Sequence, residues 1–408
     1  MRLRLAWLAF LFLAPLILLT GCGGGSGKTA SIGSSPTPSP TPGAPNPTPS
    51  PSPTPSASPT PSPSPTLAAS RFVYAIIDFE ASGGYFGGSI NRATGQVTQV
   101  PGNPTANALG QNIVLQVLPD PKGRFLYSLN EGASSFGNQF GQIGIGSYKI
   151  NQSSGALTAI PNGAVIFPAV RGALMAIDGT GHFLYQPDSG TIDTYSIDQA
   201  SGNLTLLPGQ PAAVPVGNFS AASADGHFML NEGNGMIEGF SVNNTNGQLT
   251  LTAPPVPTGG SGGPMIVSAD SSFVYAANSS EGTVAVFNIG PAGILAPVPG
   301  SPFPVDVQAA GMSLSPDGRF LYMAFGSPDI GHVKGWAVNP AAGTFTPIAG
   351  LNIANANTVN VDGLGKFAYV SQGALVTYKI DANTGALTQV SQAAQPWSDA
   401  PDDIALAH

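Results

Sequence analysis

From residue 71 onward, apolar residues occur in short runs separated by turn residues, and no stretch shows the period of an amphipathic helix. One repeat shows the arrangement well, because its apolar runs are bounded by clear turn signals such as Pro316-Asp317-Gly318. Its four predicted strands cover residues 311–315, 319–324, 333–338 and 344–348. The pattern predicts an all-β region built from four-stranded units, whose strands we call a to d from the inside outward.

Two short patterns alternate through this region, seven times each. The first is a turn with a glycine ahead of a short apolar strand, found at Gly95, Gly155, Gly202, Gly247, Gly293, Gly343 and Gly385. The second is Phe-x-Tyr, starting at Phe72, Phe125, Phe183, Phe273, Phe320 and Phe367, with Phe228-Met229-Leu230 as a departure. Successive glycines lie 42 to 60 residues apart, close to the period of a four-stranded propeller blade. The sequence therefore predicts a seven-bladed β-propeller of four-stranded blades.

The two ends of this region complement each other. Arg71–Tyr74 has the pattern of a strand b without a preceding strand a, and residues 403–408 have the pattern of a strand a without a following strand b. We expect the C-terminal strand to complete the first blade, because this pairing closes the ring and removes an open sheet edge.

The first 21 residues have the features of an export signal. Two arginines precede the uncharged apolar run Leu5–Leu19, which is short for a membrane span. Leu19-Thr20-Gly21-Cys22 is similar to the bacterial lipobox, in which the chain is cleaved before an acylated cysteine. We expect residues 1–21 to be a lipoprotein signal peptide and Cys22 to be lipidated. The alternative is an uncleaved anchor helix.

Residues 22–66 have the composition of a stalk. The segment from Pro36 to Pro65 contains 14 prolines, which favour an extended polyproline II chain. We therefore expect residues 67–408 to form the propeller, tethered to a membrane by the lipid anchor and held away from it by the stalk. Gly23 after the cysteine, by resemblance to lipoproteins of Gram-negative bacteria, indicates export to the outer membrane or the cell surface.

Charge and cysteine content exclude several classes of protein. The formal net charge is −8, and all 21 acidic residues but only ten of the 13 basic ones follow residue 70. This balance argues against a nucleic-acid partner. The single cysteine excludes an intrachain disulfide and a zinc site with several thiolates. A closed ring needs no partner for stability, so we expect a monomer.

The repeat units Asp120–Tyr127 and Pro316–Tyr322 contain the run Gly-Arg-Phe-Leu-Tyr. With the turn glycines, they make residues 71–408 similar to the seven-bladed lactonase family of propellers, which includes 6-phosphogluconolactonase-like and muconate-cyclising members. The resemblance implies the propeller fold and suggests lactone hydrolysis. Family members often carry a Pro-Arg-His element and an Asn-Glu pair near the central pocket. Here Arg171 matches the arginine and Gly172 replaces the histidine.

The candidate site residues come from this resemblance and from acids at the ends of strand b. Asn130-Glu131 and Asn231-Glu232 match the family's Asn-Glu pairs. The catalytic candidates are Arg171, Glu131 and Glu232; the candidates for ligand binding are Asn130, Asn231, Asp78 and Asp188. Carboxylates on one rim suit Ca²⁺, a cationic ligand or acid–base work. The alternative is that they are solvated loop acids.

Other polar residues are assigned to the scaffold. Aspartates recur between strands a and b, at Asp120, Asp178, Asp225, Asp270, Asp317 and Asp362, where they are expected to cap turns. The four histidines lack ligand spacing, so no metal site is predicted. The long loop that holds Ser134–Gln142 contains Phe136 and Phe140, which suit contact with a glycan or a protein.

Two functions from different classes remain open, and we place a binding or scaffold module first. The anchor, the stalk and the missing histidine favour a binding or scaffold module that presents the propeller to a glycan, a lactone or an envelope protein. The family resemblance and Arg171 favour a lactonase-type hydrolase of a neutral sugar lactone or related sugar acid, with no cofactor apart from the Ca²⁺ alternative. The excess of acidic residues disfavours a phosphorylated lactone.

Overall fold

The computed structural model describes most of the repeat region. The described residues are 71–77, 84–106, 113–131, 143–167, 174–188, 190–208, 219–326, 331–390 and 403–408. The signal peptide, Cys22, the stalk and the loop containing Phe136 and Phe140 lie outside them, and their assignments stay predictions. Within the described residues, the structure contains no helix with the length and hydrophobicity that a membrane crossing requires.

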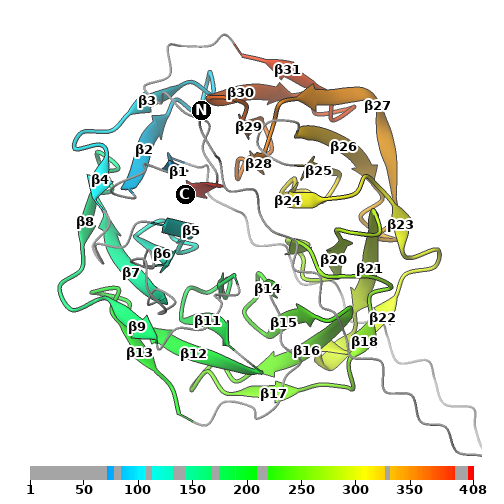
Figure 1. The fold of residues 1–408 in the computed structure, drawn as a ribbon, viewed down its shortest axis with the longest axis horizontal. Helices are drawn as coiled ribbons and strands as arrows, with labels where there is room; N and C mark the ends of the chain where they lie inside the picture. Colours follow the sequence, from blue (N-terminus) through cyan, green and yellow to red (C-terminus); the bar gives the residue numbers. More distant parts are fainter. Residues whose placement is uncertain are drawn as a thin grey trace, which may run out of the picture. The chain divides into compact units, whose positions relative to one another are not determined.

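Seven antiparallel sheets stand around a ring, which confirms the seven-bladed propeller (Figure 1). The sheets are numbered as blades in chain order. Blade 1 contains β32 (Asp403–Ala407), β1 (Phe72–Ile77), β2 (Gly84–Ile90) and β3 (Val97–Gln99), with β4 (Thr105–Ala106) beside β2. Blade 2 contains β5 (Ile113–Pro119), β6 (Phe125–Glu131), β7 (Ile143–Ile150) and β8 (Leu157–Ala159), with β9 (Val165–Phe167) beside β7. Blade 3 contains β10 (Ala176–Ile177), β11 (Phe183–Asp188), β12 (Thr191–Ile197) and β13 (Leu204–Leu206).

The remaining four blades repeat this arrangement. Blade 4 contains β14 (Phe219–Ala222), β15 (Phe228–Gly233), β16 (Met236–Val242) and β17 (Leu249–Leu251), with β18 (Val256–Pro257) beside β16. Blade 5 contains β19 (Met265–Val267), β20 (Phe273–Asn278), β21 (Thr283–Ile289) and β22 (Leu295–Pro297), with β23 (Phe303–Pro304) beside β21 and the 3₁₀ turn η1 (Pro291–Gly293) before β22. Blade 6 contains β24 (Ala309–Leu314), β25 (Phe320–Phe325), β26 (His332–Val338) and β27 (Phe345–Ala354). Blade 7 contains β28 (Thr358–Val361), β29 (Phe367–Ser371), β30 (Leu375–Ile380) and β31 (Leu387–Gln389).

The C-terminal strand closes the ring as predicted. β32 pairs antiparallel with β1, and Ala405 lies opposite Tyr74. The Arg71 amide donates a 2.7 Å hydrogen bond to the Ala407 carbonyl. In Figure 1, the red C-terminal strand lies next to the blue β1 on the inner side of blade 1. Blade 1 is therefore held together by strands from both ends of the propeller.

The two sequence patterns meet in the contact between neighbouring blades. The phenylalanine that opens each strand b packs against the turn glycine of the next blade, in the pairs Phe72–Gly155, Phe125–Gly202, Phe183–Gly247, Phe228–Gly293, Phe273–Gly343, Phe320–Gly385 and Phe367–Gly95. A Cβ on Gly202 would lie 2.5 Å from a ring carbon of Phe125. The tyrosine two residues later adds a hydrogen bond in several blades, for example 2.9 Å from the Tyr127 hydroxyl to the Gly202 carbonyl.

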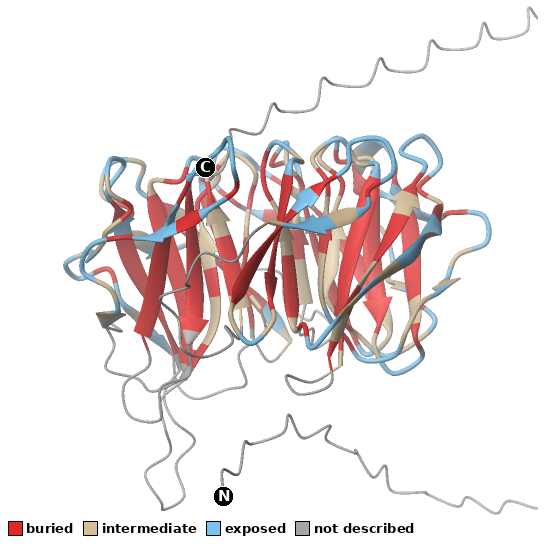
Figure 2. Cartoon of the chain, turned by 90° about the horizontal axis from the view of Figure 1, so that it is seen from above, coloured by how far each residue is buried: buried red, intermediate tan, exposed pale blue. Residues whose placement is uncertain are grey.

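The hydrophobic core also lies between neighbouring blades. Among the described residues, the buried apolar side chains form seven clusters, one between each pair of neighbouring blades. The strands are buried in the middle of the ring wall and exposed at its two rims (Figure 2). Aromatic rings from strand b therefore provide the packing that holds blade to blade.

The two rims carry different connections. The a–b and c–d turns share the rim that holds the C-terminus, uppermost in Figure 2; for example, Arg124 of an a–b turn donates a 3.0 Å hydrogen bond to the Gln199 carbonyl of a c–d turn. The b–c and d–a connections share the opposite rim, where Ser261 bonds to Glu281. We call these the turn side and the loop side.

One outer strand differs from the sequence prediction. Residues 344–348 were expected to form strand d of blade 6, but β27 continues to Ala354. A register shift opposite Lys334–Trp336 lets the extra residues pair with the start of β26. In four other blades a separate short strand takes this place.

Candidate functional site

Asn130 lies inside a buried polar network rather than in a pocket. Its Oδ1 accepts a 2.9 Å hydrogen bond from the Tyr85 hydroxyl of blade 1. Its amide donates to the Ser128 hydroxyl at 2.8 Å and to the Ser128 carbonyl at 2.9 Å. Tyr85 also donates to the Ser128 hydroxyl at 2.7 Å. These contacts join blades 1 and 2, so the geometry gives Asn130 a packing role and lends no support to ligand binding.

The two Asn-Glu pairs occupy different positions in their blades. Glu131 lies six residues after Phe125, whereas Glu232 lies four residues after Phe228. Because side chains alternate along a strand, Glu232 shares the face of Phe228, which points toward blade 5. Asn130 points the other way, toward Tyr85 of blade 1. The two Asn-Glu pairs are therefore similar in sequence but do not occupy equivalent positions in the fold.

Glu232 is a buried carboxyl without a hydrogen-bond partner among the described residues. The residue is 1% exposed, and within the described chain neither carboxylate oxygen has a partner. Burial raises the pKa of Glu232 to about 7, because the charged form loses its hydration. The backbone amide of Gly235 lowers the pKa of Glu232 and offsets this rise only in part.

A glycine-rich segment covers Glu232 from the side of blade 5. Residues 258–264 read Thr-Gly-Gly-Ser-Gly-Gly-Pro and connect β18 to β19. A Cβ on Gly262 would overlap with Oε2 of Glu232, so the carboxyl occupies the space that a side chain would need. The glycine at this position is what allows the backbone to lie directly on the carboxyl.

The same segment is held in place by blade 5. The backbone amide and the hydroxyl of Ser261 donate to Oε2 of Glu281 at 2.8 and 2.9 Å. Asn278 donates to the Thr258 carbonyl and the Thr283 hydroxyl, both at 2.9 Å. Slight burial works against ionisation of Glu281, but the hydrogen bonds from Ser261 hold its pKa below the ordinary value. Two carboxyls on the two sides of one segment thus have pKa values shifted in opposite directions.

The sequence analysis missed a second carboxyl of this kind. Glu238 is 4% exposed on β16, where it lies opposite Asn231. Burial raises the pKa of Glu238 to about 7, and its Oε2 has no partner among the described residues. It faces blade 3, away from Glu232. The available signal was a glutamate between apolar residues in strand c, in Met236-Ile237-Glu238-Gly239-Phe240.

Several candidates lie where the structure gives no side-chain description. Asp78 and Arg171 are outside the described residues. Glu131 and Asp188 end β6 and β11, but their side chains are not described. Whether these groups surround one ligand stays a prediction. Among the described residues, no group of three or more His, Cys, Asp and Glu side chains forms a metal site.

The repeated aspartates cap the a–b turns on the turn side. Oδ1 of Asp178 accepts from the His182 and Phe183 amides, both at 2.8 Å. Asp317 accepts from the Ser315 hydroxyl at 2.6 Å and the Arg319 side chain at 2.7 Å. The capping role expected for these residues is confirmed.

The arrangement around Glu232 suits proton transfer. A carboxyl with a pKa near 7 is populated in both protonation states at neutral pH, so it can accept a proton or donate one. The described residues supply this group and a glycine-rich cover. They do not place a second charged group beside it.

Comparisons with known proteins agree with this architecture. The family model "Lactonase, 7-bladed beta-propeller" matches residues 185–301, which run from blade 3 to blade 5 and contain Glu232 and Glu238. The resemblance to the lactonase propellers inferred from the sequence is therefore confirmed. No curated protein matches the chain.

Solved structures extend the likeness to the whole ring. A putative 6-phosphogluconolactonase from Bacteroides uniformis is 17% identical, with a TM-score of 0.67 over 83% of this chain and 99% of that one. A second, from Bacteroides fragilis, is 18% identical, with a TM-score of 0.63 over 85% and 100%. A periplasmic gluconolactonase from Pseudomonas aeruginosa is 19% identical, with a TM-score of 0.64 over 84% and 99%. At these identities the likeness establishes the fold.

Proposed function

We propose that this chain, a seven-bladed propeller of the lactonase type, hydrolyses neutral sugar lactones with Glu232 as its acid–base group. The observation that carries the proposal is the buried, unpartnered carboxyl of Glu232 with a pKa of about 7. It lies inside the stretch that matches the lactonase family model. These observations favour hydrolysis over a role in display alone, which the sequence analysis had placed first.

In the proposed reaction, the Glu232 carboxylate removes a proton from a water molecule as the water oxygen attacks the lactone carbonyl carbon. The ring C–O bond then breaks, and the ring oxygen takes up the proton to leave a hydroxy acid. A base with a pKa near the working pH is effective in such a step. Arg171 stays our candidate for binding the carbonyl oxygen.

Access to Glu232 requires the covering segment to shift. Gly262 lies directly on the carboxyl, and the segment of residues 258–264 contains four glycines, which permit large backbone changes. Its described side-chain anchors are the bonds from Ser261 to Glu281 and from Asn278 to Thr258. We infer that substrate enters between blades 4 and 5 when these bonds break.

Charge supports a neutral substrate. The acidic residues outnumber the basic ones by 21 to 13 in the chain, which weakens attraction for a phosphorylated lactone. The Pseudomonas aeruginosa relative is described as a gluconolactonase, and the two Bacteroides relatives as putative 6-phosphogluconolactonases. We therefore propose unphosphorylated aldonolactones.

The test is hydrolysis of a panel of aldonolactones by the full chain, followed by acid release in a pH-stat. Glu232→Gln is expected to lower kcat about 100-fold or more, and the wild-type kcat/KM is expected to rise through a pKa near 7. Glu238→Gln, which neutralises the other carboxyl of raised pKa, is the matched control and is expected to keep activity. Full activity in Glu232→Gln, or turnover of phosphorylated lactones only, would overturn the proposal.

We also propose that the chain is exported and lipid-anchored through Cys22. The support is the lipobox-like Leu19–Cys22 followed by the proline-rich residues 36–65. Cys22→Ser is expected to move the protein from the membrane fraction to the soluble fraction of a bacterial host. Equal membrane retention of both forms would contradict lipidation.

A further inference from the structure

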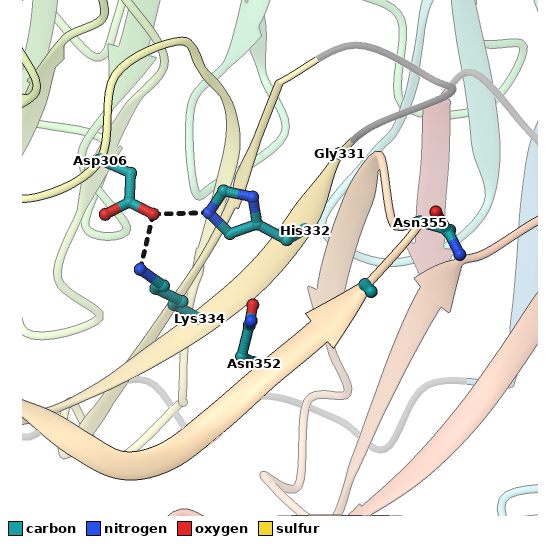
Figure 3. A pocket seen from close by; sticks show the side chains of 7 residues that line it. Asp306, Gly331, His332, Lys334, Asn352 and Asn355 are labelled. Carbon is teal, nitrogen blue, oxygen red and sulfur yellow. Dashed lines mark hydrogen bonds and ion pairs between the residues drawn. The ribbon is translucent and has the colours of Figure 1, made fainter.

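A pocket on the loop side of blade 6 lies apart from Glu232. Its volume is about 280 Å³, and its lining consists of Asp306, Gly331, His332, Lys334, Asn352, Ala354 and Asn355 (Figure 3). Asp306 comes from the connection between β23 and β24, and the other side chains come from β26, β27 and the residue after β27. This volume is near the lower end for small-molecule sites, which suits a single small ring.

The extended outer strand of blade 6 builds this pocket. In the paired strands, Lys334 lies opposite Asn352 and His332 lies opposite Ala354. Because side chains alternate along a strand, these four residues share one face, which Asp306 approaches from the blade 5 connection. Ala354 and Gly331 are small and leave the space open.

Asp306 contacts both His332 and Lys334 through one oxygen. His332 Nε2 and Lys334 Nζ each lie 2.6 Å from Oδ2 of Asp306, and Figure 3 shows both contacts ending on that atom. Within the described chain, Oδ1 accepts no hydrogen bond. Partial burial opposes ionisation, but the contacts with Lys334 and His332 hold the pKa of Asp306 below its ordinary value. The carboxylate is therefore ionised at neutral pH.

The charges and hydrogen-bonding groups select one class of ligand. The Lys334 ammonium and the Asp306 carboxylate cancel, so neither an anion nor a cation is strongly favoured. Asp306 is 34% exposed, and its Oδ1 can accept from a ligand donor, while Lys334 has further N–H groups and Asn352 offers both donors and an acceptor. An apolar ligand would leave these groups without partners. Adjacent hydroxyls fit, because each hydroxyl both donates and accepts.

We propose that this pocket binds a vicinal diol of a neutral sugar, with one hydroxyl donating to Asp306 Oδ1 and its neighbour accepting from Lys334 and Asn352. His332 stacks on Phe325 with ring centroids 5.3 Å apart and holds the carboxylate in place through Nε2. The site is separate from the proposed lactonase centre and gives the propeller a second way to contact carbohydrate.

The test is sugar binding by the full chain, measured by saturation-transfer NMR and titration calorimetry with neutral methyl hexosides. trans-Cyclohexane-1,2-diol and cyclohexanol form a matched pair of probes with two hydroxyls and one. We expect the diol and hexosides to bind and cyclohexanol not to bind. Asp306→Asn is expected to weaken hexoside binding about tenfold, since a hydrogen bond to a charged group contributes this much. Asn352→Ala is expected to weaken it about threefold, since a hydrogen bond between neutral groups contributes less.

Two controls separate this proposal from the proposed function. Glu232→Gln should leave sugar binding unchanged, and Asp306→Asn should leave lactone hydrolysis unchanged. A purified polysaccharide that binds more tightly than its monosaccharide would identify a glycan chain as the ligand, and equal affinities would identify a free sugar. Absence of binding by every hexoside, equal binding of diol and cyclohexanol, or unchanged binding in both variants would overturn the proposal.

Discussion

The capping aspartates on the turn side of this ring differ from Glu232, which lies toward the loop side of blade 4. On the turn side, aspartates such as Asp178 and Asp317 accept hydrogen bonds from the turns that they cap. Glu232 is buried without a partner among the described residues, and burial raises its pKa to about 7. The repeated aspartates therefore stabilise the turn side in blade after blade, whereas the buried carboxyl of Glu232 provides no such capping. A buried carboxyl that costs stability, such as Glu232, is a candidate for a functional group.

The largest expected effect on stability comes from removing β32, the strand that closes the ring. Removing residues 403–408 deletes β32 and its pairing with β1. We expect a loss of at least about 5 kcal/mol of stability, because an entire strand leaves the sheet and the core is exposed on both sides. Thermal denaturation followed by circular dichroism measures this. Removing only His408, which lies beyond β32, is the control, and equal melting of the two truncated chains would contradict closure by β32.

The next largest effect is a change in stability with pH, which tests the buried state of Glu232. The folded pKa of Glu232, about 7, lies above its ordinary value of 4.5, so folding favours the protonated form. The stabilisation is fully present below pH 4.5 and is lost as the pH rises through 7, by about 3 kcal/mol. Urea denaturation should show wild type less stable at pH 8 than at pH 5, and Glu232→Gln should reduce this difference.

Glu281→Gln is the matched control for that experiment. Glu281 contacts the same segment, but the hydrogen bonds from Ser261 outweigh its slight burial and lower its pKa. It is therefore ionised throughout this pH range, and its replacement should leave the slope between pH 5 and 8 unchanged. If Glu232→Gln and Glu281→Gln gave the same slope as wild type, the special state of Glu232 would be disproved.

A smaller effect is expected from two glycine substitutions, which separate the cost of a strained backbone from the cost of a clash between blades. Gly202 and Gly102 both have positive φ, of 79° and 84°. A Cβ on Gly202 would overlap with the Phe125 ring, whereas a Cβ on Gly102 would meet nothing within 4 Å. We expect Gly102→Ala to cost about 1 kcal/mol and Gly202→Ala about 3 kcal/mol. Chemical denaturation of both variants measures the difference, and equal costs would mean that the ring contact is unimportant.

The smallest effect on stability is expected for Asp317, a capping aspartate on the turn side. Partial burial opposes ionisation of Asp317, but hydrogen bonds from Ser315 and Arg319 hold its pKa below 3.8. Its contribution to stability is thus present above pH 3.8 and is lost as the pH falls, the opposite sign to Glu232. Because the side chain is half exposed, Asp317→Asn should cost less than about 1 kcal/mol at pH 7. Urea titrations should show that this cost shrinks at acidic pH, and a cost that grows there would reverse the assignment.

The fold could be predicted because each blade repeats the same physical demands. Each turn needs a glycine at positive φ, and each strand b supplies a ring to lie on the next turn, as Phe125 does on Gly202. Such demands recur at a fixed spacing, so they are visible in one sequence. The added length of β27 was not visible, because residues 349–354 become a strand only through pairing with β26.

The candidate site was only partly predictable, because it depends on contacts between residues far apart in the sequence. Glu232 was found as part of an Asn-Glu pair, but the similar pair at Asn130 lies on the opposite face of its blade and is tied to Tyr85. Glu238 and the cluster around Asp306 were missed. A glutamate between apolar residues of strand c is the short-range signal for Glu238. None marks the cluster around Asp306, whose members come from different strands and blades.

The amino-acid sequence by itself determined the number of blades, the closing strand and the capping of the turns, because these depend on residues close together along the chain and repeated around the ring. The tertiary structure alone decided which carboxyls lose their water and which keep partners. The state of Glu232 depends on Gly262, 30 residues further along, and Asp306 is joined to His332 and Lys334 across a blade boundary. Desolvation and pairing depend on three-dimensional distance, so only the folded ring could assign them.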